Sequence, residues 1–174
     1  KGIKKMKQTD NFKFDEANVM NELVYRNLSE DAKRQICAWK YGGEYDLYNL
    51  PAYEEMQVRQ IGFMNPKSEK NYYGFWDESI LVGFVNILEE KEEVFIGIGV
   101  NPDLCNKHYG QRMLLITYEI SKKLYPNKPL YLEVRTWNIR AVKCYQKAGF
   151  RIDGQAYELT TGIGTGTFYR MIRE

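Results

Sequence analysis

The stretch Leu132-Glu-Val-Arg-Thr-Trp-Asn-Ile-Arg-Ala-Val-Lys-Cys-Tyr-Gln-Lys-Ala-Gly-Phe150 is typical of a strand that leads into a helix. Asn138 follows the apolar run, and an Asn at this place caps a helix by accepting a hydrogen bond from its first turn. Ala141 and Tyr145 then share one helical face, and Gly149 is a helix-ending residue. The pattern predicts a strand over 130–135 and a helix from Asn138 that places a phenol near the end of the sheet.

A second stretch, Val94-Phe-Ile-Gly-Ile-Gly-Val-Asn-Pro-Asp-Leu-Cys-Asn-Lys-His-Tyr-Gly110, predicts a central strand over 94–100, a short loop, and then a helix over 111–124. Backbone N–H groups of such a loop and of the helix start point to one place, which favours an anion such as phosphate. Lys107 adds positive charge, and Gly110 lets the backbone approach a pyrophosphate. The alternative is a plain strand–helix connection.

The remaining segments complete one mixed sheet. We expect a strand at 22–28, helices at 29–40 and 52–63, an antiparallel pair at 71–76 and 81–88, and two strands around Gly162–Gly166. This order predicts an α/β (α+β mixed) fold with helices on both faces of the sheet. Residues 1–19 are polar and lysine-rich without periodicity, which predicts a leader or flexible arm, and residues 20–174 form a single domain.

Composition excludes several classes of function. The net charge of +2 is too small to indicate a nucleic-acid partner. No apolar run reaches the roughly 18 residues of a membrane span, so no membrane partner is expected. The three cysteines are odd in number and match no metal-binding spacing, which predicts no metal and a reduced, cytoplasmic environment.

Together the two stretches resemble the GCN5-related N-acetyltransferase (GNAT) superfamily. Residues 132–150 are especially similar to the ribosomal-protein N-terminal acetyltransferases, whose corresponding run also reads Leu-Glu-Val-Arg, then Asn, Ala, Tyr and Gly-Phe. The family's pyrophosphate loop usually reads Arg/Gln-x-x-Gly-x-Gly/Ala. Here Cys105 stands at the Arg/Gln position, Asn106 and His108 stand where glycines are common, and Gly110 keeps its type. Asn tolerates a left-handed backbone better than most residues, and His does so to some extent.

The resemblance implies a mostly antiparallel sheet that is splayed in the middle, with acetyl-CoA as co-substrate. It implies direct attack by a primary amine on the thioester in a ternary complex, with Tyr145 protonating the leaving thiolate and Glu133 acting as the base. A backbone N–H near 98–100 would stabilise the carbonyl oxygen. The residues expected to bind the cofactor are Ile98, Gly99, Val100, Cys105, Asn106, Lys107, His108, Tyr109, Gly110, Gln111, Asn138 and Tyr145.

Several of these residues have simpler interpretations. Tyr145 could equally be an aromatic residue of the core. Glu133 could equally lie on the solvated face of its strand, in which case another residue would act as the base through a water molecule. The acidic and aromatic residues Glu44, Tyr45 and Tyr48 suit a cationic amine acceptor, but they also suit a packed surface loop. Gly162–Gly166 resembles a nucleotide fingerprint but lacks the helix that must follow it, so a hairpin loop is expected.

Other functions remain as alternatives. Cys144 has no nearby histidine in the sequence to activate it, because His108 is the only one, and it is expected to be a packing residue. The departures at 105–108 leave open a non-catalytic acyl-CoA-binding or regulatory module. A nucleotide-binding protein is a third reading, against which the absence of a Walker lysine pattern counts. The expected partner is a small-molecule or peptide amine, bound by a monomer or homodimer.

Overall fold

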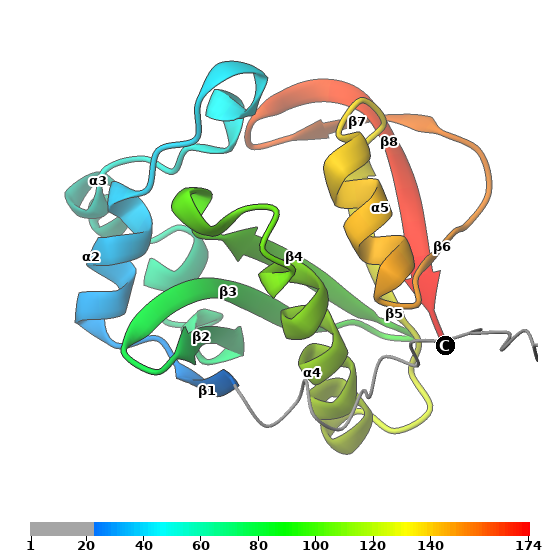
Figure 1. Ribbon diagram of the computed structural model, residues 1–174, viewed down its shortest axis with the longest axis horizontal. Coiled ribbons are helices and arrows are strands. Elements are labelled where there is room, and N and C mark those ends of the chain that lie inside the picture. The colour runs from blue at the N-terminus through cyan, green and yellow to red at the C-terminus, as the bar shows by residue number, and fades with distance from the viewer. Residues whose placement is uncertain (1–22) are drawn as a thin grey trace, which may run out of the picture.

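The computed structural model describes residues 23–174. In chain order the elements are strand β1 (Leu23–Asn27), helices α2 (Glu30–Ala38) and α3 (Tyr53–Arg59), strands β2 (Tyr72–Asp77), β3 (Ile80–Glu89) and β4 (Val94–Val100), helix α4 (Tyr109–Leu124), strand β5 (Leu130–Arg135), helix α5 (Ile139–Lys147), and strands β6 (Arg151–Ile152), β7 (Tyr157–Thr161) and β8 (Gly164–Arg173). The strands form one sheet in the order β1-β2-β3-β4-β5-β8-β6, with β7 also paired to β8 (Figure 1). Among the strands of residues 23–174, only β4 and β5 pair in parallel, so the predicted mostly antiparallel mixed sheet is confirmed. The predicted arm at 1–19 lies outside the described residues.

The sheet is splayed between β4 and β5. These strands pair only at Val94 with Leu130 and at Phe95 with Tyr131. On their other edges both strands are fully paired, β4 with β3 over Val94–Val100 and β5 with β8 over Leu130–Arg135. From Ile96 onward the edge of β4 that faces β5 therefore has no strand partner among the described residues, as the family resemblance led us to expect.

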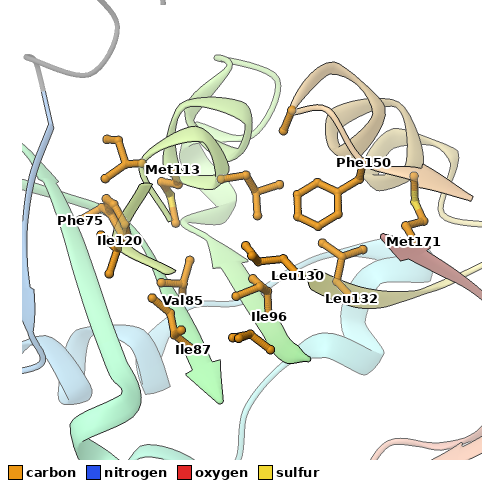
Figure 2. Packing of buried hydrophobic residues seen from close by; sticks show 14 of the residues in the cluster. Phe75, Val85, Ile87, Ile96, Met113, Ile120, Leu130, Leu132, Phe150 and Met171 are labelled. Atoms are coloured by element: carbon orange, nitrogen blue, oxygen red, sulfur yellow. The ribbon is translucent and has the colours of Figure 1, made fainter. Parts of the chain in front are cut away.

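Helices cover both faces of the sheet. Helices α4 and α5 pack over one face, where Met113, Phe150 and Leu132 belong to the larger buried cluster (Figure 2). Helices α2 and α3 pack over the other face, where Ile36 and Met56 belong to a second cluster. The strands contribute residues to both clusters, because alternate residues of a strand point to opposite faces of a sheet.

Some boundaries differ from the predicted ones. The helix expected over 52–63 ends at Arg59, because Gln60 takes a left-handed conformation with φ of 49°. The chain then forms a short 3-10 turn at Gly62–Met64. The helix expected from 111 starts two residues earlier, and the two-residue strand β6 was not predicted. Gly164 and Gly166 belong to β8, so the hairpin turn itself is Gly162-Ile163. Within residues 23–174 no helix has both the length and the apolar character to cross a membrane.

Candidate functional site

A cavity of about 650 Å³ opens where β4 and β5 separate. Its walls come from both strands, from the loop and first turn of α4, from one side of α5, and from aromatic residues of the segment before β2. The residues predicted to bind the cofactor that line it are Ile98, Gly99, Val100, Cys105, Asn106, His108, Tyr109, Gly110, Gln111, Asn138 and Tyr145. Lys107 does not line it. The two stretches singled out in the sequence therefore meet around one cavity.

The loop before α4 has a glycine-like backbone without its usual glycines. Asn106 and His108 both lie in the left-handed region, each with φ of 63°, and His108 is the N-cap of α4. The first N–H groups of a helix have no acceptor within the helix and carry a partial positive charge. Since Tyr109, Gly110 and Gln111 line the cavity, this end of α4 presents a helix N-terminus to it.

Gly110 is needed for packing as well as for access. A Cβ at this position would lie 3.0 Å from Sγ of Cys144 and 3.4 Å from Cγ2 of Val100. The missing side chain therefore lets the start of α4 approach both α5 and the end of β4. This adds a reason for the glycine that the sequence alone did not indicate.

Asn138 joins α5 to the opposite wall of the cavity. Its Oδ1 accepts a hydrogen bond from the backbone N–H of Ala141 at 3.1 Å, which confirms the predicted N-cap. Its Nδ2 donates to the hydroxyl of Tyr48 at 3.2 Å. The same side chain thus starts the helix that carries Tyr145 and fixes an aromatic residue of the 41–48 segment.

Tyr145 faces the cavity from α5 and packs against the larger core cluster. Burial raises the pKa of its phenol, which keeps the hydroxyl protonated at neutral pH. Burial also raises the pKa of the adjacent Cys144 thiol to about 11. Cys144 is therefore almost entirely protonated and a poor nucleophile, and the protonation of the Tyr145 hydroxyl does not change with pH near 7.

Glu133 lines the cavity from β5, and a tyrosine that the sequence did not indicate holds it. The hydroxyl of Tyr157, on β7, donates a hydrogen bond to Oε1 of Glu133 at 2.6 Å. Burial and this bond to a carboxylate raise the pKa of the Tyr157 phenol, so it stays a donor. No motif surrounds Tyr157, and its contact depends on the fold-back of β7 onto β8.

The aromatic segment 41–48 contributes only part of what was expected. Tyr48 lines the cavity, whereas Glu44 and Tyr45 do not. The ring of Tyr45 packs 5.6 Å from that of Trp137, and the guanidinium of Arg140 lies 4.1 Å above it. Tyr41, at the start of the same segment, lines the cavity and donates a hydrogen bond to the carbonyl of Val100 at 2.6 Å.

The charged groups around the cavity are mostly positive. Arg140, Lys143 and Lys147 line it from one side of α5, and Arg135 lines it from the end of β5. Among the described lining residues, Glu133 is the only acid. The three cations of α5 are spaced by three and four residues, so they lie on one side of the helix. This pattern is visible in the sequence.

Comparisons with known proteins identify the family and agree with the fold. A model of the acetyltransferase (GNAT) family matches residues 33–150. The crystal structure of spermidine N-acetyltransferase from Vibrio cholerae in complex with CoA and spermine has a TM-score of 0.70 at 17% identity, over 88% of this chain and 95% of that one. An acetyltransferase of the GNAT family from Streptococcus pneumoniae gives 0.63 at 24% identity, over 87% and 98%. AAC(6')-Ib in complex with ribostamycin and coenzyme A gives 0.65 at 16%, over 86% and 92%. No curated protein sequence matches the chain.

Proposed function

The chain belongs to the acetyltransferase (GNAT) family, and from that premise we propose that it transfers the acetyl group of acetyl-CoA to a primary amine by direct attack in a ternary complex. The observation that carries the proposal is the convergence of three features on one cavity. These are the unpaired edge of β4, the N-terminus of α4 and the protonated phenol of Tyr145. The V. cholerae enzyme with the same fold was solved with CoA and an amine bound together.

The residues present fit acetyl-CoA. The edge of β4 from Ile96 onward offers backbone hydrogen-bonding groups to the amides of the pantetheine arm. The first turn of α4 suits the pyrophosphate, because Asn106 and His108 supply the left-handed backbone that glycines supply elsewhere in the family. Arg140, Lys143 and Lys147 add positive charge beside these N–H groups, which helps to offset the loss of the family's Arg or Gln at position 105. When bound, acetyl-CoA supplies the activated thioester.

Glu133 is the proposed base. An alkyl amine has a pKa of about 10.4 and is mostly protonated at neutral pH, so it must lose a proton before it can attack. Glu133 is the acid on the cavity wall, and Tyr157 fixes its Oε1 while its other oxygen remains available. The carboxylate takes the proton directly or through one water.

Tyr145 is the proposed acid for the leaving sulfur. Burial keeps its hydroxyl protonated. Burial also raises the pKa of the neighbouring Cys144 thiol to about 11, so a thiolate released in this space is a stronger base than in water. The raised pKa of the phenol keeps the proton on Tyr145 until the thiolate forms, and the raised basicity of that thiolate favours the transfer to sulfur. Backbone N–H groups of the 98–100 segment, at the unpaired end of β4, are the proposed donors to the acetyl carbonyl oxygen.

Binding and chemistry are tested separately. Calorimetry with acetyl-CoA measures binding, and release of CoA thiol over a panel of amines measures transfer. Tyr145→Phe should lower kcat by about 10²–10⁴-fold and leave the Kd for acetyl-CoA within a few-fold, because it removes only a proton donor. Tyr118→Phe is the matched control, since its hydroxyl lies outside the cavity, on the carbonyl of Glu174. Unchanged turnover in Tyr145→Phe would remove Tyr145 from the mechanism.

The same experiment separates the alternatives. Binding of acetyl-CoA without thiol release by any amine would favour a non-catalytic acyl-CoA-binding or regulatory module. The similarity of 132–150 to ribosomal-protein N-terminal acetyltransferases makes a peptide amino terminus one acceptor to include, beside small-molecule amines.

The three cysteines are free thiols, which supports a cytoplasmic location for the reaction.

A further inference from the structure

Arg135 is a buried cation on the cavity wall. It ends β5 with only 8% of its surface exposed. Within residues 23–174 its guanidinium donates hydrogen bonds only to main-chain carbonyls, which belong to the β7–β8 turn and the first residues of β8. Nη2 donates to the oxygens of Ile163 at 3.4 Å and Gly164 at 3.2 Å, and Nη1 donates to that of Thr165 at 3.3 Å. These distances are at the long end for a hydrogen bond and well beyond those of a charge-assisted one.

Among the residues that the structure describes, no carboxylate neutralises this charge. Within residues 23–174 Arg135 forms no ion pair, and its Nε is buried without a hydrogen-bond partner. Buried charges are normally paired, because dipoles alone recover only part of the lost hydration. Arg170 on β8 shows the usual arrangement, since its guanidinium binds the carboxylates of both Glu93 and Asp153. Arg135 therefore has the capacity for an anionic partner that the described chain does not supply.

The surroundings make room for the guanidinium. A Cβ on Gly166 would overlap Nη1 of Arg135 and lie 2.9 Å from its Cζ, so this strand position must lack a side chain. The ring of Phe168 lies 5.0 Å from the guanidinium and also lines the cavity. The guanidinium is thus seated in a specific site at the cavity wall.

We propose that the acceptor carries a carboxylate or a similar anionic group, which Arg135 binds while the acceptor's amine lies at Glu133. The inference rests on the proposed function and specifies the substrate class of the same site. Glu133 and Arg135 lie on one face of β5, two residues or about 7 Å apart, and have opposite charges. This pair matches the two charges of an amino acid. The planar guanidinium also matches a carboxylate in geometry.

The same charges oppose a polycation. Glu133 is the one acid among the described lining residues, so spermidine would place its further ammonium groups near Arg135 or the α5 cations without a counter-charge. The expected specificity therefore differs from that of a spermidine acetyltransferase, although the fold is shared.

Matched acceptors test this inference with the full chain and acetyl-CoA. β-Alanine and γ-aminobutyrate are compared with their amides, and spermidine is the polycation. We expect the wild type to have a higher kcat/KM for each acid than for its amide. Arg135→Gln should lower kcat/KM for the acids by about 30-fold or more, mainly through KM, and should affect the amides only a few-fold. Arg135→Lys should restore part of the acid preference. Arg151→Gln is the control, because that arginine does not line the cavity.

The outcomes separate the inference from the function on which it rests. If the wild type prefers the amides or spermidine, or if Arg135→Gln lowers acid and amide turnover equally, Arg135 only holds the hairpin and the inference is overturned while the acetyltransferase stands. If acetyl-CoA binds and only amines outside this set release thiol, the inference is overturned; if no amine at all releases thiol, the proposed function itself fails. The wild-type comparison needs no variant, so the inference stays testable even if Arg135→Gln does not fold.

Discussion

Replacing Gly166 with alanine should destabilise the protein through Arg135 alone. Gly166 lies in β8 without a left-handed φ, so its backbone accepts alanine. The new Cβ would overlap Nη1 of Arg135, and the guanidinium would have to leave its place. It would then lose its three hydrogen bonds to the carbonyls of residues 163–165.

The magnitude follows from two opposing effects. Three hydrogen bonds contribute about 0.5–1.5 kcal/mol each, so their loss costs about 1.5–4.5 kcal/mol. Alanine is favoured over glycine in a strand by about 0.5–1 kcal/mol, because it loses less chain entropy on folding. The net effect of Gly166→Ala is a free energy of unfolding lower by about 0.5–4 kcal/mol, which for a chain of this size lowers Tm by about 2–4 °C per kcal/mol.

A double-mutant cycle by urea denaturation tests the cause. In an Arg135→Met background the guanidinium is absent, so adding Gly166→Ala should no longer destabilise and should stabilise by about 0.5–1 kcal/mol. The sign of the alanine effect therefore reverses between the two backgrounds. Equal destabilisation in both would show that the glycine is required for another reason and would refute the role assigned to Arg135.

Three further predictions concern the cavity. His108→Val should lower the free energy of unfolding by about 1–2 kcal/mol and His108→Gly should not lower it, because position 108 has a left-handed backbone; the reverse order in urea denaturation would contradict that conformation. Cys144, whose pKa burial raises to about 11, should be alkylated by iodoacetamide at pH 8 about 100-fold more slowly than an ordinary thiol, and more slowly still with acetyl-CoA, as peptide mass spectrometry would measure. Because burial raises the pKa of Tyr145 above its ordinary value of 10.0, that residue should cause no fall in kcat between pH 7 and pH 10; an alkaline fall in this range that Tyr145→Phe abolishes would show the opposite.

Local patterns were enough to predict the elements that carry the site. Strands β4 and β5 begin and end at the predicted residues, because each is a compact apolar run followed by a turn or a helix cap. Helix α5 begins after Asn138, as its capping chemistry requires, and Gly149 follows it with φ of 87°. By contrast, α4 begins after a left-handed His108 that makes no side-chain cap, so its true start has no sequence signal.

Contacts between distant segments were beyond prediction from the sequence. Tyr157 reaches Glu133 across 24 residues, and only the register of β7 on β8 brings them together. Arg135 binds main-chain oxygens, which every residue has, so no residue type marks its partners. The expected roles of Glu44 and Tyr45 came from their charge and aromatic character, and the structure places both outside the cavity wall.

The splay of the sheet also has a mechanical consequence. Only two residue pairs join the backbone of β4 to that of β5, so the sheet consists of two plates hinged at Val94 and Leu130. The five residues of β4 beyond these pairs span roughly 17 Å. A rotation of about 7° would therefore move the far ends of β4 and β5 apart by about 2 Å without breaking another backbone hydrogen bond between them. Side chains packed beneath α4 and α5 must resist that rotation. A substitution in the core far from the cavity can therefore change the angle between the two halves of the sheet, and with it the width of the cavity.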